Sequence, residues 1–289
     1  MGMSLENLVV LIPPLCWGIQ PLLVAKVGGL PKQQVLGSTL GALALALVAL
    51  NVVSPHLSRT VLLAGFASGA CCAVGQTNQF RSFALLGVST AMPAIVCLQL
   101  LGTSLIGVLV FHEWPTGAKV ALGTTGLLIV MLGVAMTSYK EHHDTTSKEQ
   151  RTAGLMALLL CGAGLVAYVI IPKWFNVSGW DAILPQSVGL LTTAFLLSLR
   201  GEGRPFVKKT WLNILPGLIW ATGNLALLLA DERVGVTTGF TVSQMGVIIS
   251  TLGGVFLLGE HKTRKELVLV FIGVALVIAG GILVGQARA

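Results

Sequence analysis

Uncharged polar side chains with the chemistry to bind a hydroxylated molecule stand inside long apolar stretches of this sequence. The amides and indoles that we predict to contact a ligand are Trp17, Gln20, Gln76, Gln79, Gln99, Trp220, Asn224 and Gln244. Each amide offers donors and an acceptor, so it matches a hydroxyl group, which also donates and accepts. An indole adds a flat apolar surface for the C–H face of a sugar ring, with an N–H left to bond. These residue types favour a neutral, polyhydroxylated ligand.

Spacing groups four of these residues into two pairs. Gln76 and Gln79 are three residues apart and Trp220 and Asn224 are four apart, so each pair falls on one helix face. A buried amide can instead bond to a neighbouring helix, which stabilises helix association by about 0.6 to 2 kcal/mol. That role is the better explanation for any single glutamine. For the two pairs a ligand site is favoured, because they occupy corresponding stretches of the two halves of the chain.

The charges that other substrates or an enzyme would need are missing from the middle of these stretches. An anionic substrate calls for a buried arginine or lysine, and a cationic one for a buried carboxylate. The sequence shows neither mid-stretch, and it has no HExxH motif or Ser/His/Asp set. His142, His143 and Asp144 lie together, but a solvated loop explains them better than a metal site. We therefore predict no catalytic residue, metal or cofactor, and a protein that is not an enzyme.

Two glutamates and two prolines are candidates for coupling or gating. Glu113 and Glu260 end corresponding apolar stretches, where a carboxylate can titrate, cap a neighbouring helix N-terminus or pair with a base. Structural pairing is the favoured role. Pro93 and Pro216 interrupt apolar stretches, and proline removes a helix donor and can kink the helix. A static kink is the alternative to a hinge.

The elements that must position these residues are membrane-spanning helices. The chain is 54% hydrophobic and 10% charged, whereas soluble domains carry about 25% charged residues. A helix needs about 20 apolar residues to cross a bilayer. The predicted spans, one to ten, are 7–26, 33–53, 60–80, 89–111, 117–138, 152–171, 181–199, 211–231, 237–259 and 264–285. The fold class predicted is an all-α membrane protein of ten transmembrane helices.

The second five spans repeat the first five in sequence. The corresponding strings are Gly75-Gln76 and Gly223-Asn224, Gly87-Val88-Ser89-Thr90 and Gly235-Val236-Thr237-Thr238, and Gly107-Val108 with Glu113 and Gly254-Val255 with Glu260. Five spans per half reverse the second half in the bilayer, and inverted repeats are typical of transporters that hold substrate near the midplane. We predict a first repeat at 1–138, a polar linker at 139–151 and an inverted second repeat at 152–289.

Lysine and arginine alternate between the loops on the two sides. Thirteen of the 18 fall on the side that carries the linker, which places that side in the cytoplasm and both termini outside. The net charge of +7 is explained by these loops and not by a nucleic-acid partner. The partner expected for the whole chain is the lipid bilayer of a bacterial cell membrane. Trp114, Trp174, Trp180 and Trp211 flank spans and are predicted interfacial anchors.

Motifs along the whole chain carry a family resemblance. They are Trp17-Gly18, Gly75-Gln76-x-Asn78-Gln79, Gly87-Val88-Ser89 with Met92-Pro93, Gln99-Leu100-x-Gly102-Thr103, Asp181-Ala182, Gln186-Ser187-Val188-Gly189, Leu215-Pro216-Gly217-x-Ile219-Trp220, Gly223-Asn224-Leu225, Ser243-Gln244, and Ser250-Thr251-Leu252-Gly253-Gly254 with Gly259-Glu260. At these residues the chain resembles the glucose/ribose porter family of the drug/metabolite transporter superfamily. One departure is His112-Glu113, where the superfamily's Gly-Glu occurs only at Gly259-Glu260.

The resemblance implies a ten-helix transporter that imports glucose or ribose into a bacterial cell, and family members are described as sugar:proton symporters. It also implies that spans one, three, four, six, eight and nine line a central cavity. Our own hypothesis for transport is alternating access, in which the two halves rock or bend around a midplane site. Two alternatives stay open. The same fold could export small metabolites or amino acids, or the chain could be a membrane sugar sensor that binds without transport. Glucose and ribose are not distinguished by any residue, and the oligomeric state is open.

Overall fold

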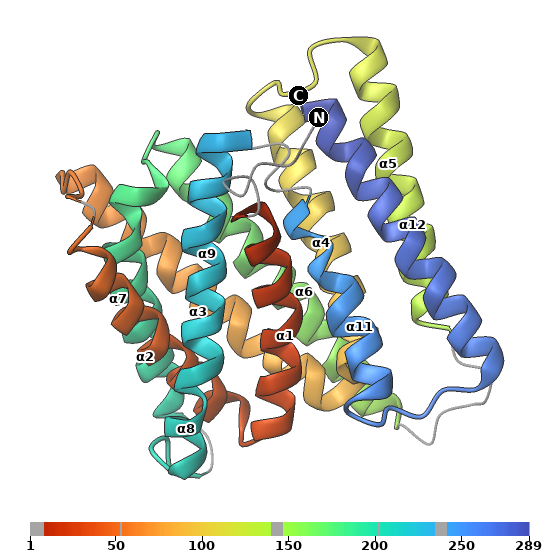
Figure 1. The fold of residues 1–289 in the computed structure, drawn as a ribbon, viewed down its shortest axis with the longest axis horizontal. Coiled ribbons are helices and arrows are strands. Elements are labelled where there is room, and N and C mark those ends of the chain that lie inside the picture. The colour runs from red at the N-terminus through yellow and green to blue at the C-terminus, as the bar shows by residue number, and fades with distance from the viewer. Residues whose placement is uncertain (1–8, 53, 140–146, 201–202, 235–241, 289) are drawn as a thin grey trace.

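Helices standing side by side make up the computed structural model of the chain (Figure 1), which describes residues 9–52, 54–139, 147–200, 203–234 and 242–288. The helices in these residues are α1 (Ile12–Val27), α2 (Pro31–Ala49), α3 (Arg59–Leu86), α4 (Val88–Leu109), α5 (Gly117–Thr137), α6 (Lys148–Trp174), α7 (Gly179–Ser198), α8 (Lys208–Leu212), α9 (Ile214–Val234), α11 (Gly246–Phe256) and α12 (Arg264–Arg288).

Most of these helices have the length and composition to cross a bilayer. Within the described residues, eight helices are long and apolar enough, with α8 and α9 counted together as Lys208–Ala230. α11 is a shorter apolar helix, and α2 has 19 residues but begins with the polar run Lys32-Gln33-Gln34. When α8 and α9 are counted as one broken span, the helices named above for the described residues number ten. The prediction of an all-α membrane protein is confirmed.

Several predicted boundaries were wrong because hydropathy locates the apolar part of a helix and not its ends. α2 ends at Ala49 instead of residue 53, and α3 continues past residue 80 to Leu86. The span predicted at 211–231 is broken at Asn213. Of the span predicted at 237–259, α11 covers Gly246–Phe256 after a turn at Gln244-Met245, and 237–241 lie outside the described residues. Residues 7–8 of the first span and linker residues 140–146, with both histidines, lie outside them as well.

Side-chain caps and one glycine set several of the helix boundaries. Ser58, Thr116 and Ser147 each accept, through the side-chain oxygen, from the backbone N–H three residues on, at 3.2 to 3.3 Å. Such caps satisfy donors that the helix itself leaves unpaired. Gly87 separates α3 from α4 with a φ of +82°, a conformation that glycine adopts without steric cost.

Glycines pair α5 with α12 in a reciprocal pattern. A Cβ on Gly126 would lie 2.7 Å from the Gly280 carbonyl oxygen, and one on Gly280 would lie 2.5 Å from that of Gly126. Gly133 and Gly273 show the same reciprocal contact, at 2.5 Å each way. Gly126 and Gly273 are 147 residues apart, as are Gly133 and Gly280. Replacing each glycine by its repeat counterpart therefore converts the Gly126–Gly280 contact into the Gly133–Gly273 contact. A two-fold relation between the halves requires such an exchange.

The positions of the chain ends agree with an odd number of crossings in each half. α1 begins and α12 ends at one face of the bundle, whereas α5 ends and α6 begins at the opposite face (Figure 1). On this basis, and on the glycine exchange, we propose that 1–138 and 152–289 are inverted repeats joined by the linker at 139–151. The face where α1 begins is called the terminal face below, and the opposite face is called the linker face.

Trp114 departs from the role predicted for it. Its side chain is buried, and its ring occupies the space beside Gly123, where a Cβ would lie 2.3 Å from two ring carbons. Trp174 and Trp211 are exposed, as interfacial anchors must be. Sequence position alone could not separate these cases, because the missing side chain at Gly123 creates the space that Trp114 fills.

Candidate functional site

A cavity of about 100 Å³ lies in the middle of the bundle and is called the central cavity. Its lining residues are Trp17, Gln20, Gln79, Met92, Ile95, Val96, Gln99, Leu165, Tyr168, Trp220, Asn224, Ser243, Gln244, Gly246 and Val247. They come from α1, α3, α4, α6, α9 and α11, with Ser243 and Gln244 directly before α11. Among these lining residues there is no Asp, Glu, Lys, Arg or His. Six spans thus enclose an uncharged space with amide, hydroxyl and aromatic groups.

The structure brings together seven of the eight residues predicted to contact a ligand. Gln76 is the exception, since it is 2% exposed and does not line the central cavity. Three helical residues turn through about 300°, so Gln76 and Gln79 point about 60° apart despite sharing a face. The neighbouring Gly75 faces α6, where its Cβ would lie 3.1 Å from the Leu165 nitrogen. Gln76 therefore lies within helix contacts while Gln79 reaches the cavity.

Gln20 is a buried residue of the central cavity with an uncommitted donor. Its side chain is 2% exposed, and its Nε2 has no hydrogen-bond partner among the described residues. A buried amide left unpaired costs about 1–3 kcal/mol, so such groups normally have a partner. An amide that lines a cavity and lacks a protein partner is placed to donate to a molecule inside it.

Trp17 joins the two halves through its indole. Its Nε1–H donates to the backbone oxygen of Trp220 at 3.3 Å. A Cβ on Gly223 would lie 2.6 Å from this same nitrogen, so the contact depends on glycine there. The indole N–H expected to serve a ligand is therefore used in the α1–α9 contact, and Trp17 presents only its apolar face to the cavity.

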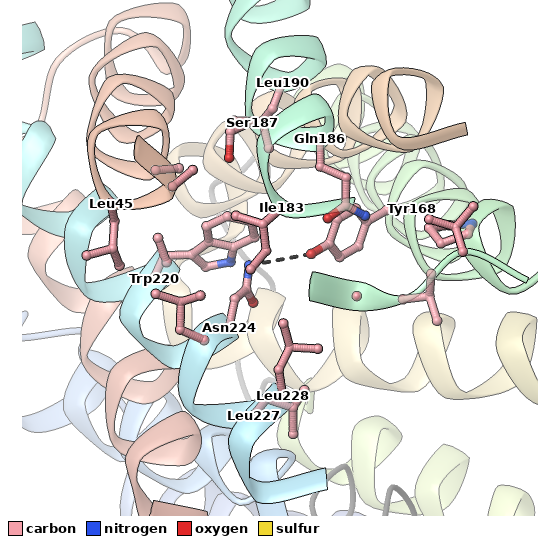
Figure 2. Close-up of a pocket in the computed structure, with 18 of the residues that line it drawn as sticks. Leu45, Tyr168, Ile183, Gln186, Ser187, Leu190, Trp220, Asn224, Leu227 and Leu228 are labelled. Atoms are coloured by element: carbon pink, nitrogen blue, oxygen red, sulfur yellow. Dashed lines mark hydrogen bonds between the residues drawn. The ribbon is translucent and has the colours of Figure 1, made fainter. Parts of the chain in front are cut away.

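Tyr168 belongs to the site, although it was missing from the sequence prediction. Asn224 donates through Nδ2 to the Tyr168 hydroxyl at 3.4 Å, and the Tyr168 and Trp220 rings lie 6.4 Å apart at 47° (Figure 2). The chain has two tyrosines, and only Tyr168 falls within a predicted span. A phenol in an apolar span needs a hydrogen-bond partner, and that signal could have identified it.

A second and larger hollow of about 520 Å³ adjoins the first, and we call it the lateral cavity. It is lined by residues of α2, α6, α7 and α9 and of the α6–α7 connection, including Leu45, Lys173, Asn176, Gln186 and Ser187. Figure 2 shows the side chains of α7 and α9 across it, with Tyr168 at one side. Lys173 and Asn176 place its outer end toward the terminal face, where α6 ends (Figure 1).

Three residues, Tyr168, Trp220 and Asn224, line both cavities. They form the wall between the lateral and the central cavity. The backbone oxygen of Tyr168 accepts a hydrogen bond from the Ser68 hydroxyl of α3 at 2.7 Å. Gln186 in turn donates through Nε2 to the Ser68 oxygen at 2.9 Å. The wall is thus anchored to α3 and α7 by a chain of hydrogen bonds.

Glu260 caps the N-terminus of α4 from the other half of the chain. Its Oε1 accepts from the Val88 N–H at 2.6 Å, and its Oε2 from the Ser89 N–H at 3.1 Å and from the Ser89 hydroxyl. A carboxylate at a helix N-terminus satisfies free donors and interacts favourably with the helix dipole. Glu260 therefore fastens α4 at the linker face.

Glu113 pairs with a basic side chain, which is the other structural role expected for these glutamates. Its carboxylate forms an ion pair with Lys173 at the end of α6, near the terminal face. The local backbone matches the second repeat, since the Glu113 N–H donates to Gly107 at 3.0 Å and that of Glu260 to Gly254 at 3.2 Å. The repeat counterpart of Val88-Ser89 is Val236-Thr237, which lies outside the described residues. Neither glutamate lines the central cavity.

The two prolines proposed as bends occupy different places. Pro93 lies inside α4, one residue after Met92, which lines the cavity. Pro216 lies in the first turn of α9, where a helix has no acceptor for its missing N–H. The break before it is at Asn213, whose Nδ2 donates to the backbone oxygens of Lys209 and Gly28. The sequence signal at Pro216 marked a helix start and not an interior kink.

An uncharged cavity inside a bundle of membrane-length helices is the architecture of a small-solute membrane transporter. The chain belongs to a family described as sugar transport proteins, whose profile it matches over residues 8–287. Membership of that family also confirms the prediction that the protein is not an enzyme.

Curated relatives match the chain over nearly its full length. One, from Listeria monocytogenes and provisionally named a sugar uptake protein, is 50% identical over 98% of this chain and 99% of its own. The Bacillus subtilis "Glucose uptake protein GlcU" is 42% identical, again over 98% and 99%. A protein of known crystal structure superimposes with a TM-score of 0.64 at 18% identity over the whole of both chains. That likeness supports the fold alone.

Proposed function

We propose that the chain imports a neutral monosaccharide, with glucose as the favoured substrate, across the bacterial cell membrane by alternating access. The observation that carries the proposal is the central cavity, where amide and indole groups from both halves meet without a charged lining residue among those described. Gln20 supplies a buried donor there without a protein partner. The relatives named for glucose uptake favour glucose over ribose.

The size of the central cavity supports a moving site. Small-molecule pockets usually measure about 300–1,000 Å³, whereas this cavity measures about 100 Å³. A monosaccharide therefore needs the cavity to widen before it fits. Inverted-repeat transporters bind substrate between halves that rock against each other, and such movement changes the room at the interface. We infer that the structure is a contracted form of the sugar site.

Proton symport is the finer part of the proposal and rests on the family resemblance. Glu113 is linked to the lateral cavity, because its ion-pair partner Lys173 lines that cavity. Protonation of Glu113 would release Lys173 from the ion pair. We propose this pair, ahead of Glu260, as the place where a proton influences transport.

Counterflow in proteoliposomes tests the proposal. Vesicles loaded with unlabelled glucose and diluted into labelled glucose should accumulate label, and labelled ribose should accumulate less. Uptake of labelled glucose should rise when the outside is made acidic. Absence of counterflow for both sugars would remove the transport claim, and uptake that ignores an imposed proton gradient would remove symport alone.

Two other functions make different predictions in the same vesicles. An amino-acid exporter would exchange labelled amino acids, yet a zwitterion calls for charged partners that the described lining lacks. A sugar sensor would bind glucose without carrying it across. Binding measured by calorimetry together with zero counterflow would establish the sensor in place of the transporter.

A further inference from the structure

We propose that the wall formed by Tyr168, Trp220 and Asn224 is a gate, and that the lateral cavity is the outer chamber through which sugar reaches the central cavity. This inference rests on the proposed function for the identity of the passing molecule. The gate itself is a property of two adjoining hollows and of the residues between them. It assigns a role to Tyr168 and a use to the larger cavity.

The two cavities are complementary in size and chemistry. The lateral cavity, at about 520 Å³, falls within the usual range for a ligand pocket, whereas the central cavity falls below it. The central cavity, however, holds most of the amides, including Gln20, Gln79 and Gln99. One cavity can therefore hold a sugar ring as it stands, and the other can recognise it after widening.

The wall is held by weak contacts on the side facing α9. The bond from Asn224 to the Tyr168 hydroxyl is long, at 3.4 Å, and the Tyr168 and Trp220 rings are tilted and not stacked. Behind the wall, the backbone of Tyr168 is anchored through Ser68. A ring on a fixed backbone that is restrained by one long hydrogen bond can swing aside about its χ angles without movement of α6.

The arrangement of helices around the wall explains why the lateral cavity exists. α3 packs against α1 and α2, as well as against α6 and α7. Its counterpart in the second repeat is α9, which packs against α1 and α2 but makes few contacts with α6 and α7 among the described residues. The lateral cavity occupies the space that α9 leaves toward α6 and α7. It therefore opens toward the terminal face, where Lys173 and Asn176 lie.

The lining of the lateral cavity is mostly apolar with a few polar groups, a mixture that suits the apolar faces and the hydroxyl groups of a sugar ring. Lys173, Asn176, Gln186 and Ser187 bring charge, amides and a hydroxyl to the lateral cavity, and Asn224 lies at its inner end. Lys173, Gln186 and Asn224 also have protein partners, in Glu113, Ser68 and Tyr168 respectively. The aromatic faces of Tyr168 and Trp220 suit a sugar ring that travels past them.

Cysteine labelling with a charged, hydrophilic thiosulfonate tests the gate on the purified full-length chain. Ser187→Cys reports on the lateral cavity and Val96→Cys on the central cavity, and both changes nearly conserve volume. Modification at each position is followed by mass spectrometry, so the native cysteines remain in place. We expect rapid labelling of Ser187→Cys and slow labelling of Val96→Cys in the otherwise unchanged chain.

Removal of the ring should open the gate. Adding Tyr168→Ala should speed labelling of Val96→Cys by about tenfold or more, because access rates depend exponentially on the barrier, and should leave Ser187→Cys unchanged. Tyr168→Phe, which keeps the ring and loses the hydroxyl, should give a smaller increase. A general loosening of the fold would instead speed labelling at both positions, and also at the buried control Cys161.

The outcomes separate the gate from the proposed function. Equal rates for Val96→Cys with and without Tyr168→Ala would show that Tyr168 is not the barrier. Absence of labelling at Ser187→Cys would show that the lateral cavity excludes polar molecules, and the outer-chamber assignment would fail. If labelling follows the expected pattern but the vesicles show no sugar counterflow, the gate stands and the substrate assignment falls.

Discussion

Gln20 and Gln76 are two buried glutamines that offer a matched test of the site. Each is 2% exposed, and among the described residues the Nε2 of Gln20 and the Oε1 of Gln76 have no hydrogen-bond partner. Gln20 lines the central cavity and Gln76 does not. A sequence shows that both are buried in apolar stretches, but only the relative rotation of α1 and α3 decides which one faces the cavity.

Gln20→Leu should reduce glucose uptake by about tenfold, the value of one hydrogen bond to the substrate. Gln76→Leu should keep uptake close to that of the unchanged protein. Leucine has a similar volume, and replacing an incompletely paired buried amide by an apolar group is close to neutral for stability. Initial uptake rates in proteoliposomes, normalised to reconstituted protein, give the comparison. Normal uptake with Gln20→Leu would remove Gln20 from the binding site.

Residue types could be predicted from the sequence, and their contacts could not. An unpaired polar group in an apolar span marks a site or a helix contact, and this reasoning found seven of the residues that line the central cavity. It missed Tyr168, and it assigned a ligand role to the Trp17 indole N–H, which donates to Trp220 instead. Both errors concern partners more than 50 residues away, which spacing along one helix cannot reveal.

At the scale of helices, the two repeat-related glutamates are expected to contribute differently to the stability of the fold. Glu260 receives three donors from the N-terminus of α4, whereas Glu113 forms one ion pair with Lys173, whose side chain is 45% exposed. A capping carboxylate has no replacement when it is lost, and exposed ion pairs contribute little. The sequence placed both glutamates at corresponding positions but could not tell which would find a helix N-terminus.

Glu260→Ala should therefore lower stability by about 1–3 kcal/mol, since it leaves amide donors at the start of α4 unpaired. Glu113→Ala, the matched control, should cost less than about 1 kcal/mol. Glu260→Gln, which retains acceptor capacity but not the charge, should fall between the two. Thermal unfolding of the three variants in the same detergent measures the order. A larger loss with Glu113→Ala than with Glu260→Ala would contradict the assignment.

Adjacent glycines in α12 give a second test at this scale. A Cβ on Gly280 would lie 2.5 Å from the Gly126 carbonyl oxygen, whereas one on Gly281 would meet no atom of the described residues within 4 Å. Gly280→Ala should destabilise by about 1–3 kcal/mol because α5 and α12 must separate. Gly281→Ala should be neutral or stabilising by up to about 1 kcal/mol, since alanine is the better helix former. Equal effects in thermal unfolding would show that α5 and α12 do not depend on close backbone approach.

At the scale of the whole molecule, the all-helical membrane architecture could be predicted, because ten apolar stretches are local features of the sequence. The inverted repetition indicated by three matching motifs stays a prediction. The two cavities could not be predicted in the same way. Their separation depends on how α9 lies relative to α6 and α7, and a repeat that is symmetric in sequence does not specify an asymmetric placement of its helices. This asymmetric placement of α9 determines toward which face of the bundle the lateral cavity lies.

Membrane orientation is the remaining question at this scale, because it decides whether the lateral cavity receives sugar from outside. Lysines and arginines concentrate at the linker face, which predicts that the terminal face is external. Ser54 and Ser138 are both exposed, near the terminal face after α2 and at the linker-face end of α5 respectively. In intact cells, an impermeant maleimide should label Ser54→Cys at once and Ser138→Cys only after permeabilisation. The reverse pattern would place the lateral cavity on the cytoplasmic side, and the structure would then show the release path of an importer instead of its loading path.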